Sequence, residues 1–162
     1  MAIKANFNLD YIFEDLNRKL KPLVNQVVAE AFEMACLEVV KQAKLRDTYQ
    51  DQTNHLRSSI GYQIYQNGEL ITEYFTADGK GDGTGATSGV DVGKNIAAQT
   101  ARKYLQDTVG VVVAGADYAL YVESKGYDVI SGSASELADI TRKYLKIAAQ
   151  GMTNAQNNQP PQ

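Results

Sequence analysis

The stretch IGYQIYQNGELITEYFT, residues 60–76, contains the clearest secondary-structure signal of the chain. In its first half Ile60, Tyr62 and Ile64 alternate with other residues, which is the period of a strand with one buried face. Asn67-Gly68 is the dipeptide that most favours a tight hairpin turn. We therefore predict an antiparallel hairpin at this point, and the rest of the fold is worked out on either side of it.

The segment before the hairpin has the period of an amphipathic helix. Apolar residues recur every three or four positions from Leu9 to Val39, and charged residues occupy the opposite face. Pro22 lies within this pattern, so it either begins a second helix or kinks a single long one. In both cases the apolar face needs a sheet or another helix to cover it.

The segment after the hairpin, ADGKGDGTGATSGVDVG at residues 77–93, contains six glycines. This content predicts a long flexible loop rather than a helix or strand. Loops of this length inside a compact domain are usually functional or disordered, and some become ordered only in an assembly. The candidate protein-interaction residues of this loop are Gly79, Gly81, Asp82, Gly83, Gly85 and Gly89.

The C-terminal half begins with a short helical pattern and then predicts a second hairpin. TVGVVVAG (108–115) has the composition of a buried strand, and YALYVES (118–124) that of its partner. Residues 137–148 predict a last amphipathic helix, and the polar ending 153–162 predicts a disordered tail. We therefore predict one α+β domain over residues 1–152. Its N-terminal and C-terminal helices pack on one face of a small, mainly antiparallel sheet of about four strands.

The composition limits the classes of function. The chain has 162 residues, 44% of them hydrophobic, and a formal net charge of −3, so it can form a real core but lacks the basic stripe of proteins that grip phosphate backbones. The single cysteine, Cys36, cannot form an intramolecular disulfide. No apolar run has the length of a signal peptide or a membrane span. We expect a protein made in a reducing cytoplasm, outside membranes and without sequence-specific binding of nucleic acid.

The usual cofactor patterns are incomplete in this sequence. A P-loop would need Ser or Thr where Asn95 stands. The relaxed dinucleotide pattern at Gly81, Gly83 and Ala86 has no helix starting at once and no acid about 20 residues on. A calcium loop would place Lys80 at a ligand position. We expect no cofactor and no metal.

The candidate catalytic residues also lack partners in the sequence. His55 is the only histidine, so it could serve as a general base but not in a multi-histidine metal site. Asp117 and Glu123 would be roughly 20 Å apart on a strand, too far to share one reacting atom. A small hydrolase using His55 and Glu123 needs the two side chains within hydrogen-bonding reach. We favour the interpretation of His55 as a polar residue at a strand entrance, Cys36 as a core residue and the ten tyrosines as interface residues.

Two segments, DQTNHLRSSI (51–60) and VVVAGADYALYVESKGYDV (111–129), together resemble a known family. They are similar to the neck or tail-completion proteins of long-tailed bacteriophages, the head–tail joining tail-component family. The form is like that of Bacteroides phages and prophages. Asn54 stands where the family has glycine, and Ser124-Lys125-Gly126 is one residue longer than the family turn; Asn can adopt the left-handed conformation that such a glycine would supply. The matching positions are Asp51, Thr53, Leu56, Arg57, Ser59, Ile60, Tyr118, Ala119, Tyr121, Val122, Glu123 and Gly126.

The resemblance implies a structural virion protein with no active site, made in the host cytoplasm and incorporated in the phage neck. It would be a subunit of a homo-oligomeric ring between the head-closure or adaptor ring and the tail terminator or tube. DNA would only pass through the lumen, where acidic side chains repel its phosphates. The alternative is a non-enzymatic peptide- or protein-binding module of a prophage or mobile element that uses the hairpin edge.

The two matched segments also suggest a specific contact. We expect Arg57 and Glu123 to pair across neighbouring strands at the end of the sheet, where a partly buried pair would fix the register. Residues 124–128 would then form an exposed turn.

Overall fold

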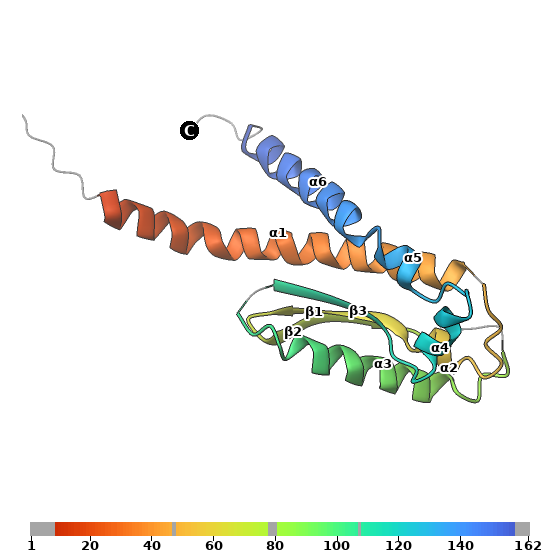
Figure 1. Ribbon diagram of the computed structural model, residues 1–162. Coiled ribbons are helices and arrows are strands. Elements are labelled where there is room, and N and C mark those ends of the chain that lie inside the picture. The colour runs from red at the N-terminus through yellow and green to blue at the C-terminus, as the bar shows by residue number, and fades with distance from the viewer. Residues whose placement is uncertain (1–8, 47, 78–80, 107, 158–162) are drawn as a thin grey trace, which may run out of the picture.

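A computed structural model describes residues 9–46, 48–77, 81–106 and 108–157. Figure 1 shows the arrangement of its elements. Along the chain these are α1 (Leu9–Leu45), α2 (His55–Ser58), β1 (Ile60–Gln66), β2 (Glu69–Phe75), α3 (Ala86–Ala101), β3 (Thr108–Ala114), α4 (Ala119–Ser124), α5 (Ser131–Ala134) and α6 (Leu137–Asn157). The predicted α+β class, with a long N-terminal helix, a C-terminal helix and a small antiparallel sheet, is confirmed.

The predicted hairpin is formed by β1 and β2. Asn67 and Gly68 have φ values of 50° and 82°, and two successive positive φ values are what the tight hairpin turn requires. The strand β1 is central, with β2 on one side and β3 on the other, and both pairings are antiparallel. The sheet of the described residues therefore has three strands, not the predicted four.

Helices cover both faces of this sheet. Ile60, Tyr62 and Ile64 of β1 pack with residues of α1, while Tyr65 and Phe75 pack against Ala97 and Ala101 of α3. In Figure 1 the sheet lies between α1 and α3. The prediction that the helices pack on one face is wrong for α3, because Phe75 of β2 and Val111 and Val113 of β3 make the second face of the sheet apolar as well.

The helix α1 is continuous, with Pro22 inside it, so Pro22 does not begin a second helix. Its C-terminal half lies in the core, where Ala35, Val39 and Val40 are fully buried. The helix α6 packs mainly on α1, through Ile140 against Ala35 and Val39. The N-terminal half of α1 extends beyond the sheet.

The predicted fourth strand, YALYVES, is wrong, because residues 119–124 form α4. Ala119 and Val122 are turned inward, whereas Leu120 and Tyr121 are exposed. This is a three-residue spacing and not the two-residue spacing of a strand. A seven-residue segment with several large side chains fits both periods, so its sequence alone did not separate them.

The predicted loop 77–93 is wrong from Ala86 onwards, where α3 begins. Gly85, Gly89 and Gly93 are spaced four residues apart and therefore lie on one side of the helix. A Cβ atom at Gly89 would overlap the His55 carbonyl oxygen, and one at Gly93 would crowd the Ser59 carbonyl oxygen. These glycines allow close packing of α3 on α2 and the start of β1, rather than flexibility.

The predicted disordered tail is also partly wrong. Residues 153–157 continue α6, and residues 158–162 lie outside the described residues. Once a helix has formed, each further residue gains one hydrogen bond when only its own φ and ψ angles become fixed. Polar residues can therefore extend an existing helix. Pro160 and Pro161, which would stop it, come later in the sequence.

Candidate functional site

The two segments that carry the resemblance, residues 51–60 and 111–129, meet at one end of the sheet. The N–H of Gly115 donates to the Ser59 carbonyl oxygen at 3.1 Å, and that of Ala116 donates to Ser59 Oγ at 3.0 Å. Beside this contact the rings of His55 and Tyr118 stack, with centroids 6.1 Å apart. The structure therefore brings together α2 and the chain just before α4, which the sequence separates by about 60 residues.

Most of the motif residues build the inside of this junction. The buried members are Leu56, Arg57, Ser59, Ile60 and Ala119. Asp51, Thr53, Val122 and Glu123 are half-buried, and Tyr118 and Tyr121 are exposed. Gly126 has a φ of 88°, in the left-handed region that glycine tolerates, and turns the chain after α4. The motifs thus divide into a buried framework and exposed tyrosines.

An open cleft of about 720 Å³ lies along residues 48–52 at this junction. A smaller hollow of about 270 Å³ shares residues 49–52 and adds Tyr118 and Val122. The segment 49–52 therefore borders both hollows. The described lining of the larger cleft is Thr48, Tyr49, Gln50, Asp51, Gln52, Arg57, Gly81 and Tyr127.

Tyr127 lines the larger cleft and Tyr118 the smaller hollow, and α4, directly after Tyr118, carries further large exposed side chains. Leu120 and Tyr121 of α4 are 78% and 63% exposed, and Tyr118 and Tyr127 are nearly half exposed. Lys125 Nζ lies 5.1 Å from the centroid of the Tyr121 ring. Tyrosine combines a flat apolar ring with a hydroxyl group and is enriched in protein interfaces. We call Tyr118, Leu120, Tyr121 and Tyr127 the tyrosine surface.

The polar wall of the larger cleft is formed by Asp51 and Arg57. The backbone N–H of Arg57 donates to Asp51 Oδ2 at 2.6 Å. The Arg57 guanidinium donates to the Lys44 carbonyl oxygen and lies 5.4 Å from the Tyr49 ring centroid. Because Arg57 is only 5% exposed, it ties the end of α1 to α2 rather than facing an incoming ligand. Burial, and then the negative charge of Asp51, raise the pKa of Tyr118, so its hydroxyl stays protonated at neutral pH.

Asn54 places the residues after β2 against this junction. It has a φ of 62° and a ψ of 11°, which is the left-handed conformation that Asn can adopt in place of glycine. Its Oδ1 accepts a hydrogen bond from the Gly81 N–H. The adjacent carbonyl oxygens of Gln52 and Thr53 accept from the N–H groups of Asp82 and Gly85, both at 2.8 Å.

The candidate interaction loop is therefore largely used in internal packing. Gly81, Gly85 and Gly89 lie against the backbone or side chains of residues 51–55, while Gly79 lies outside the described residues. Asp82 and Gly83 lie at an exposed tip, where Asp82 Oδ1 accepts from the Thr84 N–H and hydroxyl at 2.9 and 2.7 Å. These two hydrogen bonds lower the pKa of Asp82.

The relaxed dinucleotide pattern at Gly81, Gly83 and Ala86 is directly followed by a helix, α3, contrary to the expectation that none starts there. The described sheet around it is nevertheless antiparallel, whereas a dinucleotide site is built on a parallel βαβ unit. The glycines at 81 and 85 approach the backbone and side chains of residues 51–55 closely. That approach leaves the loop packed against its own chain instead of open to a pyrophosphate.

His55 begins α2 rather than standing at the entrance to a strand. Its Nδ1 lies 2.9 Å from Ser88 Oγ and 3.3 Å from the Gly85 carbonyl oxygen, both at the start of α3. Glu123 instead accepts hydrogen bonds from Ile130 and Ser131. The pair suggested for a hydrolase is therefore not joined by any interaction among the described residues.

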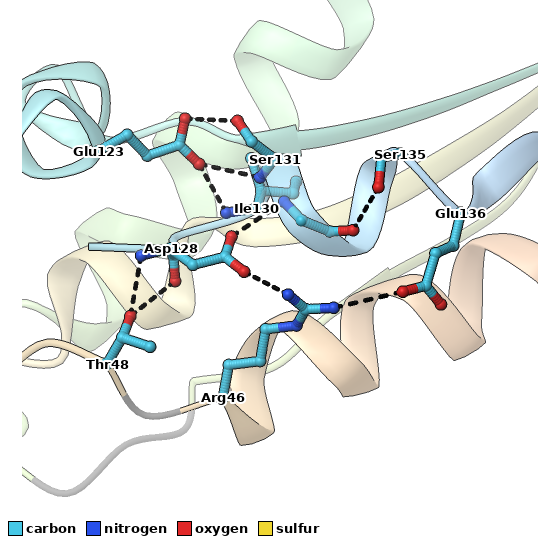
Figure 2. A network of polar contacts seen from close by, with 9 residues as sticks. Arg46, Thr48, Glu123, Asp128, Ile130, Ser131, Ser135 and Glu136 are labelled. Carbon is cyan, nitrogen blue, oxygen red and sulfur yellow. Dashed lines mark hydrogen bonds and ion pairs between the residues drawn. The ribbon is translucent and has the colours of Figure 1, made fainter. Parts of the chain in front are cut away.

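Glu123 closes the loop between α4 and α5. As Figure 2 shows, Oε1 accepts from the N–H groups of Ile130 and Ser131 at 2.8 and 2.9 Å, and Oε2 accepts from Ser131 Oγ at 2.6 Å. Burial raises the pKa of Glu123, but these hydrogen bonds together lower it below its ordinary value. The predicted Arg57–Glu123 pair is wrong, because neither residue lies on a strand and each has other partners.

Asp128 anchors the same loop to the end of α1. Arg46 forms an ion pair with Asp128, and its other terminal nitrogen lies 3.5 Å from Glu136 Oε1. The Thr48 hydroxyl donates to the Asp128 carbonyl oxygen at 2.9 Å and accepts from the Asp128 N–H at 3.0 Å. These contacts fix the chain next to Tyr127, so the tyrosine surface stands on a rigid base.

The remaining candidates for chemistry lie in the core or have no neighbours of the required kind. Cys36 is buried, and burial raises the pKa of its thiol to about 12, so it stays protonated and the prediction of a core residue is confirmed. In the ranges that the structure describes, no three His, Cys, Asp or Glu side chains lie close enough to hold a metal ion. No helix in these ranges has an apolar stretch long enough to cross a membrane.

Several residues of the site were missed by sequence reasoning. Tyr49 and Gln50 line the larger cleft, yet no motif or period distinguishes them. Gln52 and Tyr127, which also line it, lie within the two quoted segments, but the cleft itself was not predicted. The available signal was the high number of tyrosines, which predicted interface residues in general but not their positions.

Comparison with known proteins adds no relative: no family model matches the chain, and no curated protein or solved structure is significantly similar to it.

Proposed function

We propose that this protein is a structural subunit of a bacteriophage neck, in a ring that joins the head-closure complex to the tail tube. The observation that supports the proposal is the junction of the two motif segments. Buried motif residues from both segments hold together a rigid base, and Tyr118, Leu120 and Tyr121 stand exposed on it. Exposed aromatic and aliphatic side chains on a fixed base are the usual anchors of a protein interface.

In this role the tyrosine surface contacts a neighbouring neck protein or the next copy in the ring. A heterologous contact, in which one surface of a copy meets a different surface of the next, closes into a ring when the rotation allows it. The hollows beside the tyrosine surface would accept side chains of that neighbour, and the polar residues 50–52 would form hydrogen bonds at the rim.

The test is made in phage particles. The protein should be found by mass spectrometry in purified virions, and deletion of its gene should give separate heads and tails in electron micrographs. Complementation with Tyr121→Ser should restore joining poorly, whereas Tyr104→Ser, which changes a similarly exposed tyrosine after α3, should restore it fully. Absence of the protein from virions would reject the proposal.

A second candidate function is a peptide-binding module of a mobile element. The strand β2 is an edge of the sheet, and its residues Leu70 and Ile71 are about half exposed. Such an edge can accept an extended peptide as a further strand. A pull-down from induced cells separates the candidates: neck and tail proteins support the first, and host proteins support the second.

A further inference from the structure

Residues 16–34 of α1 carry a line of exposed apolar side chains. Leu16, Leu20, Leu23 and Met34 are between 46% and 52% exposed, and Val27 is half-buried. Their spacing of four, three, four and seven residues is that of the core positions of a coiled coil, with position 30 as the one place not occupied by an apolar residue. We call Leu16, Leu20, Leu23, Val27 and Met34 the α1 seam.

The described part of the chain leaves this seam uncovered. In Figure 1 the N-terminal half of α1 passes beyond the sheet, and α6 diverges from α1 as it runs toward its own C-terminus. A helix of mixed composition gains most of its stability from packing of its apolar face rather than from intrinsic propensity. A seam with this spacing is suited to another helix.

The charges beside the seam indicate which helix fits. In one antiparallel register of two α1 helices, Leu23 lies opposite Val27 and Leu16 opposite Met34. Glu30 of each helix then lies opposite Leu20 and next to Lys19 of the other. A parallel, in-register pair would instead place Glu30 opposite Glu30 within the seam itself, and like charges at such a position are unfavourable.

Lys19 and Glu30 can give up their present partners with little loss of stability. Lys19 Nζ lies 2.6 Å from Asp15 Oδ2 one turn away, and Glu30 accepts from Gln26 Nε2 at 2.9 Å. Both contacts are within one helix and exposed, where such pairs contribute little to stability.

We propose that the α1 seam pairs with the α1 seam of a second copy of this chain, antiparallel and in this register. The contact is isologous, which means that the same surface of each copy meets the other. Each residue pair in it therefore occurs twice, and the assembly is complete with two copies. It goes beyond the proposed neck function, which uses the tyrosine surface, and it leaves that surface accessible.

The first test is the oligomeric state of the full chain, measured by sedimentation velocity over a wide range of concentration. The wild type should be a concentration-dependent dimer. Leu23→Asp should be a monomer with an unchanged circular dichroism spectrum, because Leu23 is exposed in the single chain, whereas Leu120→Asp should still dimerise. A wild-type monomer at every concentration, or a Leu23→Asp dimer as tight as the wild type, would overturn the pairing.

The second test examines the register. Lys19→Glu and Glu30→Lys should each weaken the dimer roughly tenfold, because each places like charges together twice in the symmetric contact. The double variant should recover the wild-type dissociation constant. Failure of the double variant to recover would overturn the register. None of these outcomes bears on the presence of the protein in virions, so failure here and failure of the neck function are distinguishable.

Discussion

At Gly89 the missing side chain allows α3 to lie on the first turn of α2. A Cβ atom there would overlap the His55 carbonyl oxygen, which belongs to the backbone and cannot turn aside. Gly151 provides the contrast, since it also lies in a helix but has no atoms near the position that a Cβ would take. Packing therefore requires glycine at position 89 but not at position 151.

We expect Gly89→Ala to destabilise the protein by roughly 1–3 kcal/mol, the usual cost of forcing extra atoms into a packed contact. Gly151→Ala should instead stabilise it by about 0.5–1 kcal/mol, the difference in helix propensity. Urea unfolding of the two variants beside the wild type measures both values. Equal effects of the two substitutions would contradict the packing role of Gly89.

Glu123 gives a pH dependence with a definite sign. Its hydrogen bonds lower its pKa in the folded protein below the ordinary value of 4.5. The stabilisation by the carboxylate is therefore present above the unfolded-state pKa and is lost as the pH falls through the folded-state pKa. The melting temperature of Glu123→Gln should be lower than that of the wild type at pH 7, and the gap should narrow below about pH 4.5. A gap independent of pH would show that the charge of Glu123 is not involved.

At the scale of elements, the end of α1 is joined to the segment between α4 and α6 by Arg46 and Asp128. Both side chains are partly exposed, so their coupling free energy should be about 0.5–1 kcal/mol. A double-mutant cycle with Arg46→Ala and Asp128→Ala, followed by urea unfolding, measures it.

A double-mutant cycle with Arg57→Ala and Glu123→Ala should be additive, because these two residues do not pair. An additive cycle for Arg46 and Asp128, together with a non-additive cycle for Arg57 and Glu123, would contradict the structure of this segment.

The elements with a single clear period were predictable from the sequence. The hairpin was indicated by alternation and by Asn67-Gly68, and α1 by its long apolar stripe. The errors have a common physical cause. At α3 and α4 the structure is decided by contacts with distant residues, such as Gly93 against Ser59 and Ala116 against Ser59, and local propensity does not include such contacts.

The candidate site was predicted in its parts but not in its geometry. The sequence pointed to the two segments that meet at the junction, but not to the way in which they meet. The assumption of a fourth strand then placed Glu123 opposite Arg57, whereas in α4 it points to Ser131. A cleft depends on several segments at once, so the sequence did not show that Tyr49 and Tyr127 would line the same one.

At the scale of the whole molecule, the two halves of α1 have different surroundings. Residues 35–43 lie in the core, whereas residues 14–24 are largely exposed. In the Leu23→Asp monomer, amide hydrogens of residues 14–24 should exchange much faster than those of residues 35–43, because local opening there disrupts little packing. Hydrogen exchange followed by mass spectrometry measures this difference. Uniform protection along α1 would contradict the description of a helix with only one half in the core.

The continuity of α1 through Pro22 has a consequence for spacing. A helix of 37 residues is about 55 Å long. The α1 seam covers residues 16–34 in the middle of this helix, and the Arg46 and Thr48 contacts that support the tyrosine surface lie just beyond its C-terminal end. If both proposed contacts form, this uninterrupted helix sets the distance between the two partners.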